Sequence, residues 1–461
     1  MPPPALHDLT IRQAADALRR RELSPVDLTE AVLDRVRRLD GVLNAYITVT
    51  EEAALAQARA AEREIAAGTY RGPLHGIPLA YKDLFATRGV RTTAGSRLLA
   101  GWVPDYDAEA VARLHAAGAV MLGKLNLHEF AYGVTTANPH YGPCRNPWDT
   151  TRSPGGSSGG SGAAVAAGLA LGALGTDTGG SIRIPAALCG VVGLKPTYGR
   201  VSRHGVVPLA WSLDHVGPLA RTVEDAALLL AAVAGFDPKD PAAADAPVPD
   251  YAAALAGDAR GLRAGVLGGH FTAGADPEVL AALAAAVQTL EGCGVRTDGA
   301  ELDHAGDALT AATCIMFSEA SAYHERDLRE RPEDYGPDVR ARLELGELYR
   351  ATDYLRAQRA RTVFVQEVLA LLDRFDVLVA PATPVPAPPI EGGDPAARLV
   401  QYTSPFNLAG LPAVSVPCGF TAAGLPVGMM LVGRPFEEAT VLRAAAAYQG
   451  ATDWHRRRPP L

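Results

Sequence analysis

The sequence predicts an α/β fold in which helices and strands form layers, because helical patterns alternate with short apolar runs typical of buried strands. The strand-like runs cover residues 77–81, 119–122, 262–267 and 376–380. Helical patterns cover residues 25–40, 51–67, 108–117 and 276–290, and a long polar helix is expected near 336–373. At roughly 100–200 residues per domain, 461 residues correspond to two or three domains or to one large α/β unit.

Local signals define the first elements in order. Ser24 is a good N-cap and Pro25 suits the first helical position, so a helix is expected from Pro25 until Gly41 ends the apolar periodicity. The Ala-rich helix that follows ends at Gly68. The strand-like run 77–81 leads directly into Lys82, and Gly118 separates the helix at 108–117 from the next strand.

Composition excludes several classes of protein. The net charge of −8 argues against a nucleic-acid-binding surface, which is normally basic. No stretch reaches the ~18 apolar residues of a membrane helix, and the first residues lack the pattern of a secretory signal. The five cysteines are scattered and form no CxxC pair, which fits reduced thiols and indicates neither disulfides nor a metal site. We therefore expect a cytoplasmic protein without metal or cofactor.

The middle of the chain is rich in Gly, Ser, Thr and Ala over residues 153–193, yet it does not resemble a linker. Flexible Gly/Ser linkers lack apolar periodicity, whereas residues 163–174 consist entirely of Ala, Leu, Val and Gly and must be buried as a helix or turn. The segment 237–250, rich in Pro, Asp and Ala, is predicted to be a surface loop within a single domain of residues 1–461.

Three segments carry residues suited to nucleophilic catalysis. They are the AYKD sequence at 80–83, the PGGSSGGSG sequence at 154–162 and the GTDTGGSIRIP sequence at 175–185. Gly179 and Gly180 allow backbone N–H groups to converge beside Ser181, as an oxyanion hole requires. A serine nucleophile also needs a base, and Lys82 is one of only four lysines, with Lys124, Lys195 and Lys239.

At these spacings the three segments resemble the amidase signature family. Lys82 precedes Ser157 by 75 positions, and Ser157 precedes Ser181 by 24, as in that family. The resemblance continues through residues 189–200, 212–218 and 407–419, and it spans roughly residues 8 to 450. It implies a single α/β/α sandwich with a central mixed, mostly parallel sheet.

The resemblance also implies roles for individual residues. Ser181 would be the nucleophile, Ser157 would relay its proton from a cis peptide bond, and Lys82 would be the general base. To act as a base Lys82 must be neutral, and burial is the expected cause of a lowered pKa. Other positions matching the family are the oxyanion-hole residues Thr178, Gly179 and Gly180 and the supporting residues Ser158, Thr176, Asp177 and Arg183.

Several functions remain open within this family. We expect a free-standing amidase that cleaves a small, fairly apolar amide, aryl amide, ester or carbamate, with urethanase activity included, and that forms a homodimer. Phe130, Tyr132 and Ile182 are predicted walls of its pocket because they lie close in sequence to the motifs.

One alternative is the glutaminase component of a tRNA-dependent amidotransferase. Residues 322–328 and Val400 depart from the pattern of that component, which has an acid for the glutamine amino group where this chain has Val400. Another alternative is a catalytically idle subunit with a role in assembly.

Overall fold

A computed structural model describes residues 5–390 and 396–461 of the chain. Eleven strands form one large sheet, and two short strands form a separate hairpin. The large sheet has the order β1-β3-β2-β6-β8-β7-β12-β13-β11-β9-β10. The strands are β1 (Tyr46–Val49), β2 (Pro78–Lys82), β3 (Val120–Leu125), β4 (Ala137–Asn138), β5 (Gly142–Pro143), β6 (Gly172–Asp177), β7 (Val192–Lys195), β8 (His215–Ala220), β9 (Arg263–Leu267), β10 (Arg296–Ala300), β11 (Val377–Pro381), β12 (Ala413–Phe420) and β13 (Pro426–Val432).

Helices precede, separate and follow the strands along the chain. They are α1 (Ile11–Arg19), α2 (Pro25–Leu43), α3 (Glu51–Ala66), α4 (Glu109–Ala116), α5 (Gly159–Ala166), α6 (Arg183–Cys189), α7 (Val223–Val233), α8 (Tyr251–Ala254), α9 (Pro277–Gly292), α10 (Ala305–Glu330), α11 (Pro337–Gly346), α12 (Ala351–Arg374), α13 (Ala396–Leu399), α14 (Ser404–Leu408) and α15 (Glu438–Gly450). Within the described ranges, no helix is both long and apolar enough to cross a membrane.

The predicted α/β architecture with a central mixed sheet is confirmed, but the sheet is not mostly parallel. Four neighbouring pairs are parallel and six are antiparallel in the described structure. Five of the six antiparallel pairs lie together in the middle of the sheet, from β6 through β8, β7, β12 and β13 to β11, and the sixth, β1 with β3, lies at one edge. The hairpin connection between β12 and β13 accounts for one of them, since a short turn can only join antiparallel strands.

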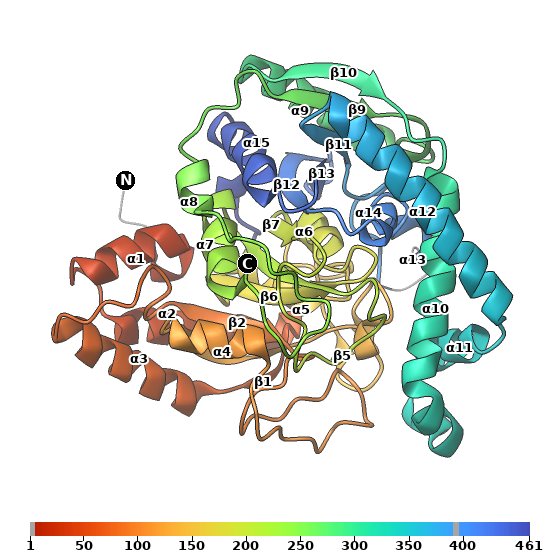
Figure 1. Ribbon diagram of the computed structural model, residues 1–461. Coiled ribbons are helices and arrows are strands. Elements are labelled where there is room, and N and C mark those ends of the chain that lie inside the picture. Colours follow the sequence, from red (N-terminus) through yellow and green to blue (C-terminus); the bar gives the residue numbers. More distant parts are fainter. Residues whose placement is uncertain (1–4, 391–395) are drawn as a thin grey trace.

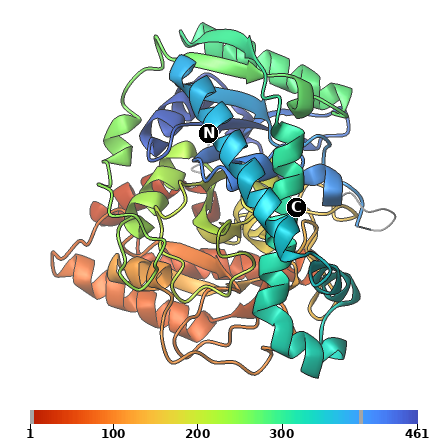
Figure 2. The ribbon, with the colours of Figure 1, turned by 45° about the vertical axis from the view of Figure 1, so that its right-hand side comes forward.

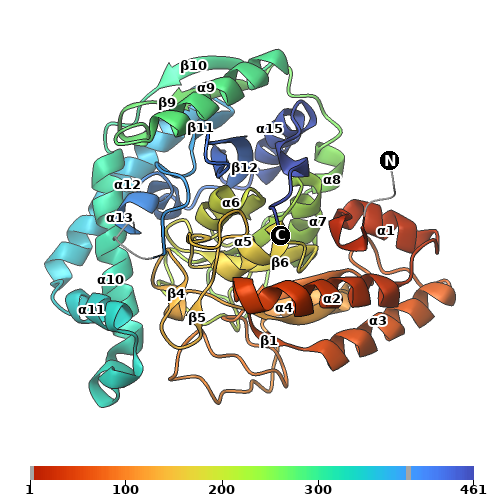
Figure 3. The same ribbon diagram turned by 180° about the vertical axis from the view of Figure 1, so that it is seen from behind.

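Helices cover both faces of the sheet (Figures 1 and 3). Residues of β13 alternate between two apolar clusters: Met429 and Leu431 pack with α9 and α15, whereas Met430 and Val432 pack with α10, α12 and α14. The strand is buried along its whole length as a result. Figure 2 shows α10 and α12 side by side along one flank, and α11 also contacts α10.

Most of the predicted elements are present, with three differences. Helix α2 continues through Gly41 to Leu43 and stops there because the next residue, Asn44, has a left-handed φ of 51°. The expected long helix near 336–373 is two helices, α11 and α12. The buried segment 163–174, expected to be one helix or turn, is divided between α5 and β6. Residues 237–250, the expected loop, contain no helix or strand.

The topology places the chemically interesting segments together. Strands β2 and β6 are parallel neighbours, so their carboxyl ends meet at one edge of the sheet. Lys82 ends β2, and Asp177 ends β6 just before the loop that contains Ser181. Ser157 lies in the loop that leads into α5, and this loop is joined to the Ser181 loop by a hydrogen bond from the Ser158 N–H to the Ser181 carbonyl (3.2 Å).

Candidate active site

Lys82 is fully buried at the end of β2. Its Nζ atom lies 2.7 Å from Ser157 Oγ and 2.7 Å from Thr176 Oγ1. Burial lowers the pKa of Lys82 to about 7, although the negative charges of Asp177 and Asp214 act in the opposite direction. A substantial fraction of this amine is therefore neutral at physiological pH, and a neutral amine can accept a proton.

Ser157 is held between the lysine and the backbone of neighbouring segments. The Gly156–Ser157 peptide bond is cis, and the Ser157 carbonyl accepts a hydrogen bond from the His128 N–H (3.1 Å). The N–H of Ser158 donates to the carbonyl of Ser181 (3.2 Å), and its hydroxyl donates to the carbonyl of Thr176 (3.1 Å). These bonds connect the loop before α5 to the loop after β6.

The loop after β6 contains Thr178, Gly179 and Gly180 directly before Ser181. In the described part of the chain, the N–H groups of Thr178, Gly179, Gly180 and Ser181 donate to no protein acceptor. Gly180 has a φ of +138°, and a Cβ atom there would collide with Thr403 Oγ1. The Thr403 hydroxyl also donates to the Gly179 carbonyl (2.6 Å). This fixes the loop so that its free N–H groups can bind an anion.

A buried ion pair between Asp177 and Arg183 supports the loop that contains Ser181. Arg183 Nε and Nη2 donate to the two carboxylate oxygens of Asp177 (3.0 and 2.9 Å), and both side chains are fully buried. Asn407 in α14 donates to Asp177 Oδ1 (2.8 Å) and accepts from Arg183 (2.6 Å). Burial alone would raise the pKa of Asp177, but the charge and hydrogen bonds of Arg183 hold it below its usual value. Asp177 also accepts from the Ile182 N–H (3.1 Å), which orients the turn that follows Ser181.

Ser181 lines a cavity of about 320 Å³ whose walls are mostly apolar. Residues from the loop side include Tyr132, Val134, Leu209 and Val400. Helix α10 contributes Leu309, Thr313, Met316 and Phe317, and α11 contributes Arg342. The Arg342 guanidinium donates to the Tyr132 carbonyl (2.7 Å) and to Asp338 (2.8 Å), so one cation stands in a mostly apolar wall.

The structure brings together the candidate catalytic, oxyanion-hole and supporting residues, which are Lys82, Ser157, Ser158, Thr176, Asp177, Thr178, Gly179, Gly180, Ser181 and Arg183. Of the three residues expected to form pocket walls, Tyr132 lines the cavity that contains Ser181. Phe130 and Ile182 do not line it. Phe130 packs edge-on against His324, and Ile182 is fully buried against Gly193 and Gly217 of the sheet.

Sequence reasoning missed several residues that complete the site. Asn407 opens the 407–419 block, so the sequence marked its position but not its contact with Asp177. Thr403 stands near Gln401 and Ser404, and no local signal set it apart. Asp214 accepts from the Thr178 hydroxyl (2.6 Å), which no local pattern could indicate. The cavity wall from α10 and α11 is far away in sequence and depends on tertiary packing alone.

The fold and the site define an α/β protein in which a buried lysine and two serines lie at one edge of the sheet. The Amidase family pattern matches residues 27–442, and the chain belongs to this amidase family, a class of hydrolases that act on carbon–nitrogen bonds. It is 49% identical to the A component of the glutamyl-tRNA(Gln) amidotransferase from Roseiflexus sp. (strain RS-1), over 99% of each chain.

Solved structures agree with this assignment. One, from a vestigial protein complex that reveals the evolutionary origins of an s-triazine catabolic enzyme, is 42% identical with a TM-score of 0.93. The alignment covers 96% of this chain and 98% of that one. The native peptide amidase from Stenotrophomonas maltophilia is 35% identical with a TM-score of 0.87, over 98% of each chain.

Proposed function

We propose that the chain hydrolyses the C–N bond of a small carboxamide through an acyl-enzyme on Ser181. The observation that carries this proposal is the buried Lys82 amine, 2.7 Å from Ser157 Oγ and with a pKa lowered to about 7. A buried lysine of this kind is a suitable general base near neutral pH.

In the proposed mechanism, neutral Lys82 accepts the proton of Ser157, and Ser157 accepts the proton of Ser181. The Ser181 oxygen then attacks the amide carbon, and the N–H groups of the 178–181 loop bind the developing oxyanion. The tetrahedral intermediate collapses when the C–N bond breaks, and the nitrogen receives a proton from Lys82 through Ser157. A water molecule then attacks the ester carbon along the same proton path and releases the acid.

For the substrate, we propose an amide that releases ammonia, with glutamine as the first candidate. The similarity to the A components of glutamyl-tRNA(Gln) amidotransferases favours this alternative over the free-standing amidase expected from the sequence. The Arg342 guanidinium at the cavity wall would pair with a substrate carboxylate. Partner subunits, including any that bring tRNA, belong to the same proposal, whereas a homodimer, a cytoplasmic location and activity on carbamates stay predictions.

A second candidate is an amidase for carboxylated amides without an amino group. It is favoured by Val400, which lines the cavity with an apolar side chain where an acid would be needed for an ammonium group. The two candidate functions share the mechanism, and their substrates differ only in whether an amino group is present.

Ammonia release from glutamine and from glutaramate, which lacks only the amino group, separates the two candidates. Glutamine should give the higher kcat/KM if the chain is a glutaminase, and glutaramate should do so for the second candidate. The variant Val400→Asp should shift the preference toward glutamine by about tenfold, because it adds a charged partner for the ammonium group. If Ser181→Ala hydrolyses either amide as fast as the wild type, the shared mechanism is wrong.

A further inference from the structure

Ser404, the first residue of α14, lines the cavity that contains Ser181. The residue is buried, and its backbone N–H donates to the Val400 carbonyl (2.9 Å). Among the described residues, no protein group forms a hydrogen bond with its hydroxyl. None of the roles assigned above uses this hydroxyl. Because buried polar groups are normally hydrogen-bonded, a hydroxyl without a protein partner inside a cavity is available to a bound molecule.

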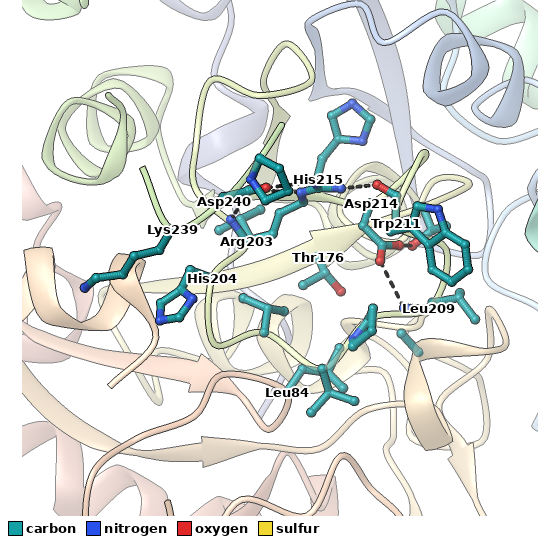
Figure 4. A pocket seen from close by; sticks show the side chains of 17 residues that line it. Leu84, Thr176, Arg203, His204, Leu209, Trp211, Asp214, His215, Lys239 and Asp240 are labelled. Atoms are coloured by element: carbon teal, nitrogen blue, oxygen red, sulfur yellow. Dashed lines mark hydrogen bonds and ion pairs between the residues drawn. The ribbon is translucent and has the colours of Figure 1, made fainter. Parts of the chain in front are cut away.

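The two threonine hydroxyls of the same cavity are already engaged. Thr313 donates to the carbonyl of Leu309, one turn earlier on α10 (2.9 Å). Thr178 donates to Asp214 (2.6 Å), which lines a neighbouring cavity and also accepts from the Leu209 N–H (2.9 Å; Figure 4). Neither threonine therefore has a hydroxyl proton to offer to a substrate.

Two other polar side chains of the cavity differ from Ser404 in access or in charge. The Tyr132 hydroxyl is shielded from solvent, so a molecule in the cavity does not reach it. Arg342 is a cation that is bound to Asp338 (2.8 Å). Apart from the nucleophile Ser181, the Ser404 hydroxyl is thus the uncharged group in the described cavity wall that can both donate and accept a hydrogen bond.

Ser404 lies next to the loop whose N–H groups would bind the oxyanion. A Cβ atom on Gly179 would stand 3.8 Å from Ser404 Oγ and 3.9 Å from the Val400 side chain. Thr403 fixes this arrangement, because its hydroxyl donates to the Gly179 carbonyl (2.6 Å) and its own carbonyl accepts from Arg183 (3.0 Å). The hydroxyl of Ser404 is therefore held in place before any substrate arrives.

This position selects one part of the substrate. An amide that reacts here would place its carbonyl oxygen at the N–H groups of the 178–181 loop. The carbon atom next to that carbonyl then lies close to Ser404, and a substituent on this carbon would meet the hydroxyl. No carboxylate lines the described cavity, and Arg342 adds a positive charge, so an ammonium substituent would find no counter-charge. A neutral hydroxyl substituent would find a partner.

We propose that Ser404 determines specificity for a 2-hydroxy amide, whose hydroxyl group stands on the carbon next to the scissile carbonyl and exchanges a hydrogen bond with Ser404 Oγ. This inference rests on the proposed acyl-enzyme and develops its second candidate, a carboxylated amide without an amino group. Arg342 would pair with the carboxylate, as proposed above, and Ser404 would recognise the substituent beside the reacting carbon.

The test uses four amides that differ at one position. They are glutaramate and its three derivatives with a methyl, a hydroxyl or an ammonium group on the carbon next to the amide, the last of which is isoglutamine. Both enantiomers of each derivative are used, and ammonia release gives kcat/KM. The methyl and hydroxyl groups have similar sizes, so the ratio of these two constants isolates the hydrogen bond.

The wild type should prefer the hydroxyl amide to the methyl amide by about tenfold, and isoglutamine should be at least about tenfold slower than the hydroxyl amide. Ser404→Ala should bring the hydroxyl-to-methyl ratio within about twofold of one. This variant removes no hydrogen bond within the described structure, so it should fold. Thr313→Val is the matched control, because the hydroxyl that it removes is engaged by Leu309; the ratio should stay within about twofold of the wild type.

Four results would overturn the role of Ser404. They are equal constants of the wild type for the hydroxyl and methyl amides, a faster reaction with isoglutamine than with the hydroxyl amide, a hydroxyl preference that persists in Ser404→Ala, and an equal loss of preference in Thr313→Val. Failure to release ammonia from any of the four amides, glutaramate included, is a different result, because it would contradict the proposed function and with it this inference.

Discussion

At the scale of single residues, the proposed chemistry depends on Lys82, one of very few lysines in the chain. The sequence contains 43 lysines and arginines, but lysine stands at only four positions. Lys239 has a largely exposed side chain, and Lys195 donates to the carbonyls of Pro196 and Leu411 between strands. Lys124 is bound by Thr87, Thr92 and the carbonyl of Phe85. Among the described residues, Lys82 alone has its amine beside two hydroxyls and no carbonyl.

The pH dependence of activity should follow this lysine. Because Lys82 acts as a base only when neutral, kcat/KM should rise with pH through about 7 and level off above it. Lys82→Arg should be inactive across the whole range, since a guanidinium does not lose its proton. A pH–rate profile of the wild type on a neutral amide measures this. A profile that is flat between about pH 6 and 8 would contradict the role of Lys82.

The same lysine should affect stability, with a defined sign. Its pKa is about 7 in the folded chain and near 10.5 when unfolded, so the unfolded chain binds more protons between these values. The free energy of unfolding should therefore rise as pH increases from about 7 to 10. Urea unfolding of the wild type and of Lys82→Met isolates this contribution, because the methionine cannot titrate. Equal slopes for the two proteins would show that Lys82 is not desolvated.

At the scale of elements, the carboxyl ends of β2 and β6 and the loops beyond them carry the site. The order of these elements could be predicted, because the strand-like run before Lys82 and the Gly/Ser motifs are local signals. The contribution of α14 could not, since Asn407 reaches Asp177 across 230 positions. Nearness in sequence to the motifs does not determine on which side of a turn a side chain lies, and Phe130 packs against His324 outside the cavity that contains Ser181.

The ion pair between Asp177 and Arg183 should be essential to the stability of these loops. Asp177→Asn should lower the free energy of unfolding by about 3–5 kcal/mol, because it leaves a fully buried guanidinium without a counter-charge. Glu224→Gln is a matched control, since it breaks a partly exposed pair with Arg12 and should cost less than about 1 kcal/mol. Urea titrations of the three proteins measure the difference. Similar losses in both variants would argue against a supporting role for the buried pair.

At the scale of the whole molecule, helices far away in sequence from the motifs form part of the wall of the cavity that contains Ser181. No sequence motif predicts that they meet there. The sequence was sufficient to predict an α/β fold and the residues around Ser181, because these depend on local periodicity and on short motifs. It was insufficient for the antiparallel centre of the sheet and for α10, a helix of 26 residues that forms part of the cavity wall. Both depend on pairing between distant segments, whose energies are not encoded in any local pattern.

Two hydrogen bonds attach α11 to the segment before the catalytic loop. Glu129 accepts from the Gly336 N–H (2.7 Å), and Asp338 lies 2.8 Å from His128 Nε2. Burial would raise the pKa of Asp338, but its hydrogen bond with His128 and the charges of His128 and Arg342 hold it below its usual value, so the carboxylate is the acceptor. His128 in turn donates its backbone N–H to Ser157, and Arg342 lines the cavity. The wall of the cavity and the proton relay are thus connected through Asp338.

Asp338→Ala should therefore raise KM severalfold and leave kcat within about twofold, because it loosens the wall that contacts substrate without touching the reacting atoms. The loss of folding stability should stay below about 1 kcal/mol, since the Asp338 side chain is 42% exposed. Glu333→Ala, at an exposed position just before α11, is the control and should change neither constant. Steady-state kinetics on the best amide substrate measure both. A fall in kcat comparable to that of Ser181→Ala would mean that Asp338 acts on the chemical step, and an unchanged KM would mean that α11 does not depend on this carboxylate to close the cavity.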